Sequence, residues 1–195
     1  MAPKPRQSRE QLLEAAFRVL RREGEDAVNI RAVAAEAGCS TQPVMTHFPT
    51  AGALKEALYE MADACHTGYI MPENQQDENP MLGIGLRYIR FAEEEPQLFR
   101  FLFQSGHFSG FSLEELIRTP ETAGILAAVS QAGELPAESA AAFFEPLFAT
   151  VHGYASLIAN NAMKYDPEAI RKALITIAEG MDRGWNQNDE TVQEK

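Results

Sequence analysis

The sequence predicts an all-α fold in two parts, an N-terminal three-helix domain over residues 6–66 and a helical C-terminal domain over residues 67–190. Strand-like alternation of apolar and polar residues is scarce, and alanine, leucine and glutamate dominate between the glycines and prolines. In addition, two short helical patterns are separated only by Gly38, Cys39 and Ser40, which is the spacing of a helix-turn-helix.

The first two helices carry their own boundary signals. Ser8 and Gln11 fit a capping box at the start of the first helix, and Gly24 is expected to end it. An apolar stripe recurs at helical spacing between these boundaries. The second helix is expected to begin at Asn29 and to stop at Gly38.

The third helix contains a proline, and the position of this proline indicates where the helix begins. If Ser40 is the N-cap, Pro43 lies in the first turn, where a backbone N–H has no intrahelical partner and its absence costs little. Val44 and Phe48 lie four residues apart, so they share one face of this helix and are predicted to point into the core.

Further helices are predicted after the third, and a polar loop over residues 72–80 divides them. Their expected ranges are 50–69, 81–95, 97–105, 112–133 with a break at Pro120, 137–164 and 167–186, and the tail from residue 186 is expected to fray.

The chain is acidic, with a formal net charge of −11. Residues 1–70 carry 8 basic and 9 acidic side chains, whereas residues 71–195 carry 9 and 19. This balance argues against a generally basic protein that coats nucleic acid, but it leaves room for a local basic patch in the N-terminal part.

Cysteine usage and hydropathy predict a cytoplasmic protein. Cys39 and Cys65 are the only cysteines and lack C-x-x-C spacing, which indicates a reducing compartment. The N-terminus shows no apolar signal region. The one long apolar stretch, residues 139–159, contains a glutamate, a proline and a histidine, so it predicts a helix buried against protein and no membrane span.

Four side chains of the third helix are predicted to point outward: Thr41, Gln42, Met45 and Thr46. A merely solvated face would favour glutamate and lysine. This strip suits a DNA major groove, because glutamine can pair with adenine and the methyl groups of threonine and methionine can pack against thymine. Arg and Lys are absent from this helix, so the commonest guanine contact is missing. Similar three-helix domains also occur in proteins that bind no nucleic acid, so the pattern alone leaves both interpretations open.

Contacts to DNA phosphates are expected from outside this strip. Lys4 and Arg6 form a basic arm ahead of the first helix, and Arg31 lies in the first turn of the second. Ser40 and the free N–H groups at the start of the third helix can face an anion, and Lys55 could reach the DNA backbone from the fourth helix.

Residues 9–58 resemble the TetR family of transcriptional regulators, from "REQLLEAAFRVLRREGEDAVNIRAVAAEAGCST" to "HFPTAGALKEAL". The individual matches are a helix ending in Arg-Glu-Gly, the segment "IRAVAAEAG", the turn "GCS", the pair His47-Phe48, and Leu54 in the next helix. The resemblance implies a homodimeric, ligand-responsive repressor with no enzymatic activity. Its N-terminal domain would bind a palindromic double-stranded operator, with His47 among the DNA-binding residues, and its C-terminal domain would dimerise and hold a small-molecule effector.

The sequence departs from the family pattern at three positions. Family members commonly have aromatic residues where Met45 and Thr46 stand, and a lysine where Ala51 stands. Thr50, as the expected N-cap of the fourth helix, could replace the lysine by offering a hydroxyl and a backbone N–H to a phosphate.

The last two predicted helices are apolar on more than one face, so one side needs cover beyond the chain's own domain. The resemblance implies a four-helix dimer interface here, and a wholly intrachain core is the alternative. The residues expected at this interface are Phe144, Leu147, Phe148, Val151, Ala155, Ile177 and Met181.

The effector pocket is expected to be lined by aromatic residues and histidines of the C-terminal domain. The candidates are Phe91, Phe103, His107, Phe111, His152 and Tyr154, although for each aromatic residue the sequence favours a place in the core over the pocket. Cys65 and His66 are adjacent and lack ligand spacing, so neither a metal nor a cofactor is expected.

Two other functions remain as alternatives. An all-helical enzyme is one, but the sequence shows no nucleophile–base pair, metal motif or phosphate loop that would support it. A helical adaptor that has lost DNA binding is the other, favoured by the acidic net charge and the absent lysine. The sequence leaves open the effector, the operator and the choice between repressor and activator.

Overall fold

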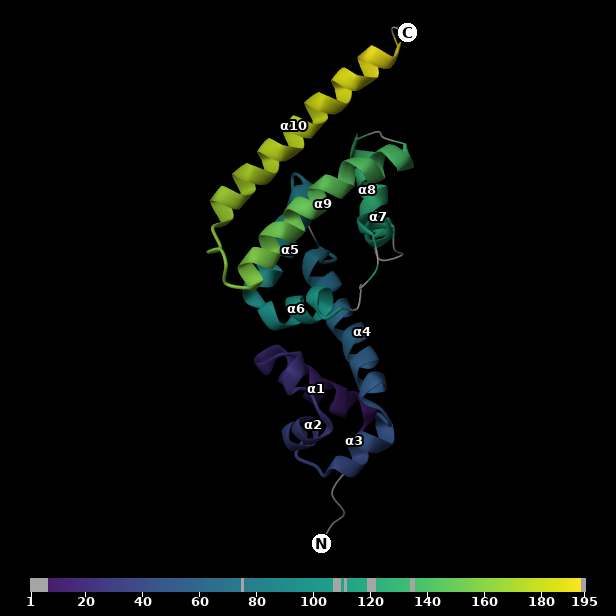
Figure 1. Ribbon diagram of the computed structural model, residues 1–195, viewed down its shortest axis with the longest axis vertical. Coiled ribbons are helices and arrows are strands. Elements are labelled where there is room, and N and C mark those ends of the chain that lie inside the picture. Colours follow the sequence, from purple (N-terminus) through teal and green to yellow (C-terminus); the bar gives the residue numbers. More distant parts are fainter. Residues whose placement is uncertain are drawn as a thin grey trace. The chain divides into compact units, whose positions relative to one another are not determined.

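The computed structural model describes residues 7–74, 76–106, 110, 112–118, 122–133 and 136–193. Within these residues every regular element is a helix (Figure 1), which confirms the all-α prediction. The chain divides by its contacts into two compact units, in which unit 1 comprises residues 1–69 and 94–107, and unit 2 comprises residues 70–93 and 108–195.

Unit 1 is built from the first helices of the chain together with one later helix. Its elements are α1 (Arg9–Glu23), the 3-10 turn η1 (Glu25–Ala27), α2 (Ile30–Glu36), α3 (Thr41–His47), α4 (Ala51–Ile70, of which the last residue belongs to unit 2) and α6 (Pro96–Gln104). The core between them consists of aliphatic residues of α1 to α4 and the phenylalanines of α6.

The boundaries of α1 are the predicted ones. The Ser8 hydroxyl accepts the N–H of Gln11 at 3.2 Å, and the Gln11 side chain accepts the N–H of Ser8 at 2.9 Å, so the capping box is complete. Gly24 ends the helix with φ of 90°. A Cβ at Gly24 would lie 2.7 Å from Oε1 of Gln97 on α6, but this flexible side chain can move aside, so it is the backbone conformation that requires glycine.

The turn between α2 and α3 depends on one glycine. Asn29 caps α2 by accepting two N–H groups of its first turn, at 3.1 and 3.0 Å. Gly38 then adopts φ of 66°, a left-handed conformation that glycine reaches without strain. The N–H of Cys39 donates to the carbonyl of Ala34 at 2.9 Å and closes the turn.

Helix α3 begins as predicted. Ser40 is its N-cap in an extended conformation, although its side chain makes no capping hydrogen bond, and Pro43 is the third helical residue. Val44 and Phe48 are 0 % and 1 % exposed, which confirms their predicted place in the core. These two side chains fix the rotation of the helix and therefore decide which residues face outward.

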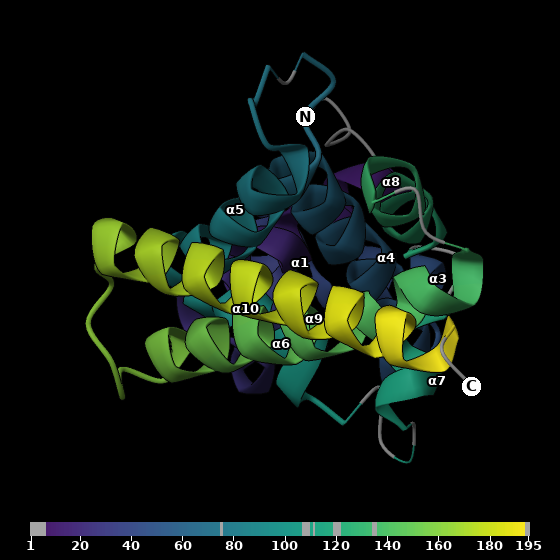
Figure 2. The same ribbon diagram turned by 90° about the horizontal axis from the view of Figure 1, so that it is seen from above.

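Unit 2 contains α5 (Pro80–Glu94, with its last residue in unit 1), α7 (Leu113–Ile117), α8 (Ala123–Gly133), α9 (Ala137–Ala159) and α10 (Pro167–Gln193). Helix α10 lies along α9 in both views (Figures 1 and 2). A core cluster joins α7, α8 and α9 and consists of Ile117, Ile125, Val129, Ala140 and Phe144.

The prediction that one helix covers residues 137–164 is wrong at its end. Asn161 adopts a left-handed conformation with φ of 55°. Its N–H donates to the carbonyl of Ile158 at 2.9 Å, and the N–H of Ala162 donates to the carbonyl of Leu157 at 2.8 Å. This pair of bonds is a Schellman motif, which ends α9 at Ala159 because asparagine tolerates the left-handed conformation where most residues do not.

The prediction that the tail frays from residue 186 is also wrong, since α10 runs on to Gln193. Residues 186–193 contain no proline or glycine, so each can continue the helical hydrogen-bond pattern. The predicted break at Pro120 falls outside the described residues, and the structure shows separate helices on either side of it, α7 and α8.

The imidazole of His66 is buried in unit 1. His66 is 6 % exposed, and its ring meets the ring of Phe103 on α6 edge-on, with centroids 5.1 Å apart. Burial lowers the pKa of His66 from its ordinary 6.5 to about 4, because the low-dielectric surroundings disfavour the charged ring.

This burial predicts a specific loss of stability in mild acid. Between pH 6.5 and about 4 the unfolded chain binds a proton at His66 that the folded chain does not, so the free energy of unfolding falls as the pH falls. The loss from this group is on the order of 3 kcal/mol at the acid end of the window. Urea unfolding at several pH values should show a shallower pH dependence for His66→Phe than for the wild type. Equal slopes for the two proteins would contradict the assignment.

Candidate DNA-binding site

Helix α3 presents an uncharged strip to solvent. Thr41, Gln42 and Thr46 are exposed, and Met45 is 51 % exposed. His47 at the end of the helix is exposed as well. The structure therefore brings the predicted strip together on one face of a helix whose other face is buried.

One polar group of this strip is already engaged. The hydroxyl of Thr46 donates to the carbonyl of Gln42 at 2.9 Å, within the helix. The Thr46 methyl group and the Gln42 side-chain amide are left for contacts outside the protein. Immediately after α3, the Thr50 hydroxyl accepts the N–H of Ala53 at 3.0 Å, so Thr50 performs the predicted capping of α4.

Several cations of unit 1 are held by carboxylates. Arg18 pairs with Glu36 at 2.8 Å, and Arg22 pairs with the same carboxylate at 3.2 Å. Arg21 pairs with Glu95, next to the start of α6. These exposed pairs contribute little stability, but they occupy the arginines.

Lys55 is also paired, with Glu25 of η1 at 2.6 Å. Both side chains are partly exposed, so exchanging this partner for a phosphate would cost little. Arg31, by contrast, is exposed in the first turn of α2 and has no carboxylate within ion-pair distance in the part of the chain that the structure describes. Lys4 and Arg6 lie outside the described residues.

Sequence reasoning missed two residues near α3. The guanidinium of Arg9 lies over the ring of Phe48, 5.2 Å from its centroid, at the end of α3. Gln7 donates its side-chain amide to the carbonyl of Ala37 at 3.2 Å and holds the start of the described chain against the turn between α2 and α3. The position of Arg9 at the start of α1 could have been noticed in the sequence. A cation in the first turn of a helix interacts unfavourably with the helix dipole, which suggests that Arg9 is there for a contact outside the helix.

The predicted effector residues are distributed over both units. Phe91 is fully buried in unit 2, and Phe103 packs against His66 in unit 1. Tyr154 is partly buried on α9, while His107 and Phe111 lie outside the described residues.

His152 on α9 has a defined environment in unit 2. The hydroxyl of Tyr88 on α5 lies 2.9 Å from Nδ1 of His152, and the ring of Phe148 stacks on the imidazole with centroids 5.7 Å apart. Burial lowers the pKa of His152, so the neutral ring is favoured. A neutral imidazole that contacts a phenol and an aromatic ring is suited to orienting a polar group of a largely apolar ligand.

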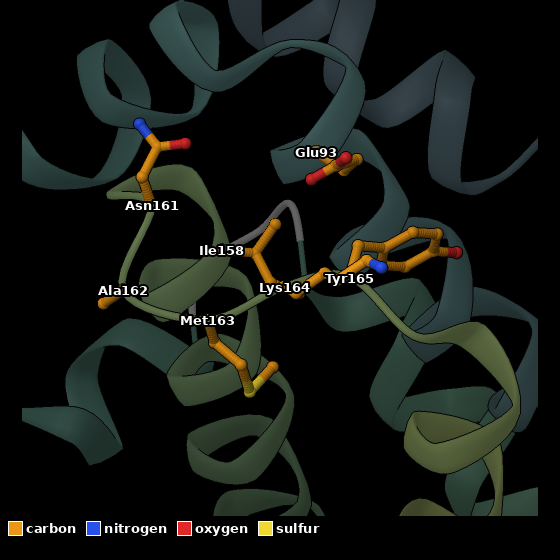
Figure 3. Close-up of a pocket in the computed structure, with 7 residues that line it drawn as sticks. All are labelled: Glu93, Ile158, Asn161, Ala162, Met163, Lys164 and Tyr165. Atoms are coloured by element: carbon orange, nitrogen blue, oxygen red, sulfur yellow. The ribbon is translucent and has the colours of Figure 1, made fainter.

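An open groove of about 330 Å³ lies elsewhere in unit 2, where α9 ends (Figure 3). Glu93 on α5 and Lys164 bring opposite charges to it, Ile158 contributes apolar surface, and the remaining lining comes from the loop before α10. None of the predicted effector residues lines this groove.

The residues predicted at a dimer interface differ in exposure. Phe144 and Ala155 are buried within unit 2, where Phe144 belongs to the core cluster. The other five, Leu147, Phe148, Val151, Ile177 and Met181, are partly buried. The exposed large apolar side chains of these helices are Leu157, at 48 %, and Ile175, at 37 %.

The described residues offer no metal-binding cluster, since no group of three His, Cys, Asp or Glu side chains among them is placed to hold a metal ion. Nor does any helix in the described ranges combine the length and the hydropathy that crossing a bilayer requires.

Comparisons with known proteins identify both halves of the chain. A family model described as "Bacterial regulatory proteins, tetR family" matches residues 12–60, and one described as "Tetracyclin repressor-like, C-terminal domain" matches residues 81–178. The chain belongs to the TetR family. The resemblance predicted from the sequence is confirmed, and this TetR-family protein is a transcriptional regulator with a helix-turn-helix DNA-binding domain.

Solved structures share the fold of this TetR-family chain. A protein of unknown function from Rhodococcus sp. RHA1 is 23% identical, covering 94% of this chain and 98% of its own, with a TM-score of 0.68. A tetR-family transcriptional regulator from Streptomyces coelicolor is 21% identical, covering 90% and 85%, with a TM-score of 0.62. The multidrug binding protein EbrR, complexed with imidazole, is 19% identical, covering 89% and 95%, with a TM-score of 0.51. No similar sequence was found among curated proteins.

Arg9 and Arg31, for which the described part of the chain shows no carboxylate partner, are expected to contact DNA phosphates. Arg9→Ala and Arg31→Ala should each weaken binding to all duplex sequences alike and reduce the slope of log affinity against log salt by about 1. Fluorescence anisotropy titrations over a range of salt concentrations measure both quantities. Arg171→Ala, which changes an exposed arginine of α10 in unit 2, is the matched control and should alter neither. An effect confined to one duplex sequence would contradict the phosphate role.

Proposed function

We propose that this protein is a homodimeric repressor that binds a palindromic operator and leaves it when a small-molecule effector binds. The observation that carries the DNA-binding part is the exposed uncharged strip of α3 within a TetR-type N-terminal domain. We assign residues 6–66 to DNA binding and residues 67–190 to effector binding and dimerisation, which the two family-model matches support.

The proposed contacts divide into two classes. Thr41, Gln42, Met45 and Thr46 would face base edges in the major groove, and His47 would lie at the end of the same strip. The phosphate contacts would position α3 in the groove without reading sequence. They would come from Lys4, Arg6, Arg9, Arg31, Ser40, Thr50 and Lys55.

The dimer is supported by an unusual outward face on α9. Ala142, Pro146, Ala149, Gly153 and Leu157 recur at steps of three and four residues, and all five are exposed and uncharged. A helix face without a charge over this length is suited to burial against protein. A second copy of the same face would satisfy it by two-fold symmetry, and a two-fold dimer suits a palindromic operator, whose half-sites lie about 34 to 36 Å apart.

Val151, predicted at the interface, lies on the opposite side of α9, where a Cβ at Gly85 of α5 would come within 3.3 Å of its side chain, so we leave it out of the proposed interface. Phe144 and Ala155 are covered by their own chain, so we assign them to the core of unit 2 and leave them out of the proposed interface.

Effector control is supported by the neutral, partly buried His152 and by the Tyr88 hydroxyl beside it. EbrR, a structural neighbour, is a multidrug binding protein that was solved with imidazole. A ligand releases DNA only if it binds more tightly to a conformation that does not fit the operator. We propose His152 as an effector contact. Tyr154, two residues further along α9, points to another side of the helix and is left out of this contact. No enzymatic step is part of the proposal.

The adaptor alternative keeps some support in the pairing of Lys55 with Glu25 and in the alanine at position 51. A regulator of operators would act in the cytoplasm, where bacterial DNA is. Selection from a pool of random duplexes at low salt separates the possibilities, because an adaptor or an enzyme would enrich no sequence.

Gln42→Ala tests the proposed base contact. Loss of a bidentate contact to adenine should cost roughly 1–3 kcal/mol on the selected operator and remove discrimination at one base pair, while non-specific binding stays the same. Quantitative gel-shift titrations with the operator and with its single-base variants measure this. Gln76→Ala, which changes an exposed glutamine of unit 2, serves as the control. Unchanged discrimination at every base pair would refute the assignment.

Leu157→Glu tests the proposed dimer. A carboxylate in the middle of an apolar two-fold interface would be repeated on both subunits and left without a partner, so the dimer dissociation constant should rise at least tenfold. Sedimentation velocity over a concentration series measures the constant. Met71→Glu introduces the same carboxylate at an exposed apolar side chain away from α9, 40 % exposed, and should leave association intact. A Leu157→Glu protein that dimerises like the control would exclude this face.

A further inference from the structure

Met45 is the most exposed of the large apolar side chains in the described part of the chain, at 51 %. It lies on α3 among the side chains that would face DNA. The side of α3 that packs into the core is formed by Val44 and Phe48, so Met45 is not needed there. Leaving such a side chain in water forgoes the gain of burying it. Single exposed apolar side chains are common on protein surfaces, so what distinguishes Met45 is its place among the outward side chains of α3, where an apolar group of the DNA could cover it.

The major groove offers one apolar group among the four standard bases, the C5-methyl group of thymine. The other groove-edge groups are hydrogen-bond donors and acceptors, which a thioether does not satisfy. A methionine aimed at base edges therefore distinguishes thymine from the rest by contact with that methyl group.

The neighbours of Met45 favour the same base pair. The Thr46 hydroxyl donates to the Gln42 carbonyl at 2.9 Å, so what Thr46 offers outward is chiefly its methyl group. The Gln42 amide is exposed and matches the donor and acceptor of adenine. Helix α3 carries neither arginine nor lysine, the side chains that most often read guanine.

We infer that the operator half-site places A·T pairs opposite α3 and that Met45 is a specificity-determining residue that reads a thymine methyl group. This inference rests on the proposed function and adds to it the chemistry of the recognised base. It makes Met45 responsive to a single methyl group in the DNA and not to the hydrogen-bonding pattern of the pair.

The test exchanges thymine for deoxyuridine, which removes the methyl group and leaves base pairing intact. The full chain first selects its operator from random duplexes, and each thymine of a half-site is then replaced in turn. Fluorescence anisotropy at fixed salt gives the affinities. One or two replacements should weaken wild-type binding about fourfold each, the value of one buried methyl group.

The contribution of Met45 to the contact is tested with two variants at that position. Met45→Ala should bind the unmodified operator more weakly and should no longer distinguish thymine from deoxyuridine at the sensitive position. Met45→Leu keeps an apolar side chain and should retain part of the sensitivity. Met71→Ala, at another exposed methionine, should behave as the wild type. Because Met45 is exposed, the thermal unfolding of its variants should match the wild type.

The outcomes separate the inference from the proposed function. If no duplex is enriched, the DNA-binding proposal fails and the inference falls with it. If an operator is found but no thymine is sensitive to loss of its methyl group, the inference is overturned and the DNA-binding proposal stands. The inference is likewise overturned if the sensitivity persists in Met45→Ala, because another side chain would then be reading the methyl group.

Discussion

The left-handed turn at Gly38 and the burial of Val44 and Phe48 fix the direction and the rotation of α3. Helix α3 has 7 residues, well below the length at which an isolated helix is stable in water. Its helical geometry therefore depends on the two buried side chains, and its direction depends on the turn. Because a helix rotates as a unit, fixing Val44 and Phe48 inward fixes Gln42, Met45 and Thr46 outward. The DNA-facing strip is thus a consequence of core packing.

The pairing of charges in unit 1 limits the attraction of this acidic protein to DNA of arbitrary sequence. Arg18 and Arg22 share Glu36, and Lys55 is held by Glu25, so much of the positive charge of unit 1 is neutralised locally. Arg9 lies over the ring of Phe48, and Arg31 sits beside the cap of α2. A surface with few unpaired cations releases few counterions on binding, which limits affinity for arbitrary sequences. Discrimination would then come from contacts to the bases, which we propose for α3.

Local signals allowed much of this fold to be predicted from sequence, and tertiary contacts account for what was missed. The caps at Ser8 and Asn29 and the placement of Pro43 depend on residues within one turn, so the sequence alone locates them. The end of α9 depends on Asn161 adopting a left-handed conformation, which few residues other than glycine do, and a continuing apolar pattern obscured it. The position of Arg9 over Phe48 joins residues 39 positions apart, and no spacing rule reveals such a contact. The burial of Phe144 in a cluster with α7 and α8 is likewise invisible to helical periodicity, which shows that a face is apolar but not what covers it.

The absence of arginine and lysine from α3 bears on how an effector could release the protein from its operator. Coupling between an effector and DNA binding in allosteric proteins is typically about 1–3 kcal/mol, a factor of roughly 5 to 150 in affinity. A regulator held to DNA by many phosphate contacts would remain bound non-specifically after such a change. If the proposed short-range contacts of Gln42 and Met45 carry the specificity, a small displacement of α3 would remove the contacts that distinguish the operator from other DNA, while the proposed phosphate contacts would remain. Methyl contacts are the most sensitive to such a displacement, because dispersion attraction falls by about a quarter to a half when a gap of only 0.5–1 Å opens. The proposed uncharged reading helix would therefore let a modest allosteric coupling shift the protein from its operator to non-specific DNA.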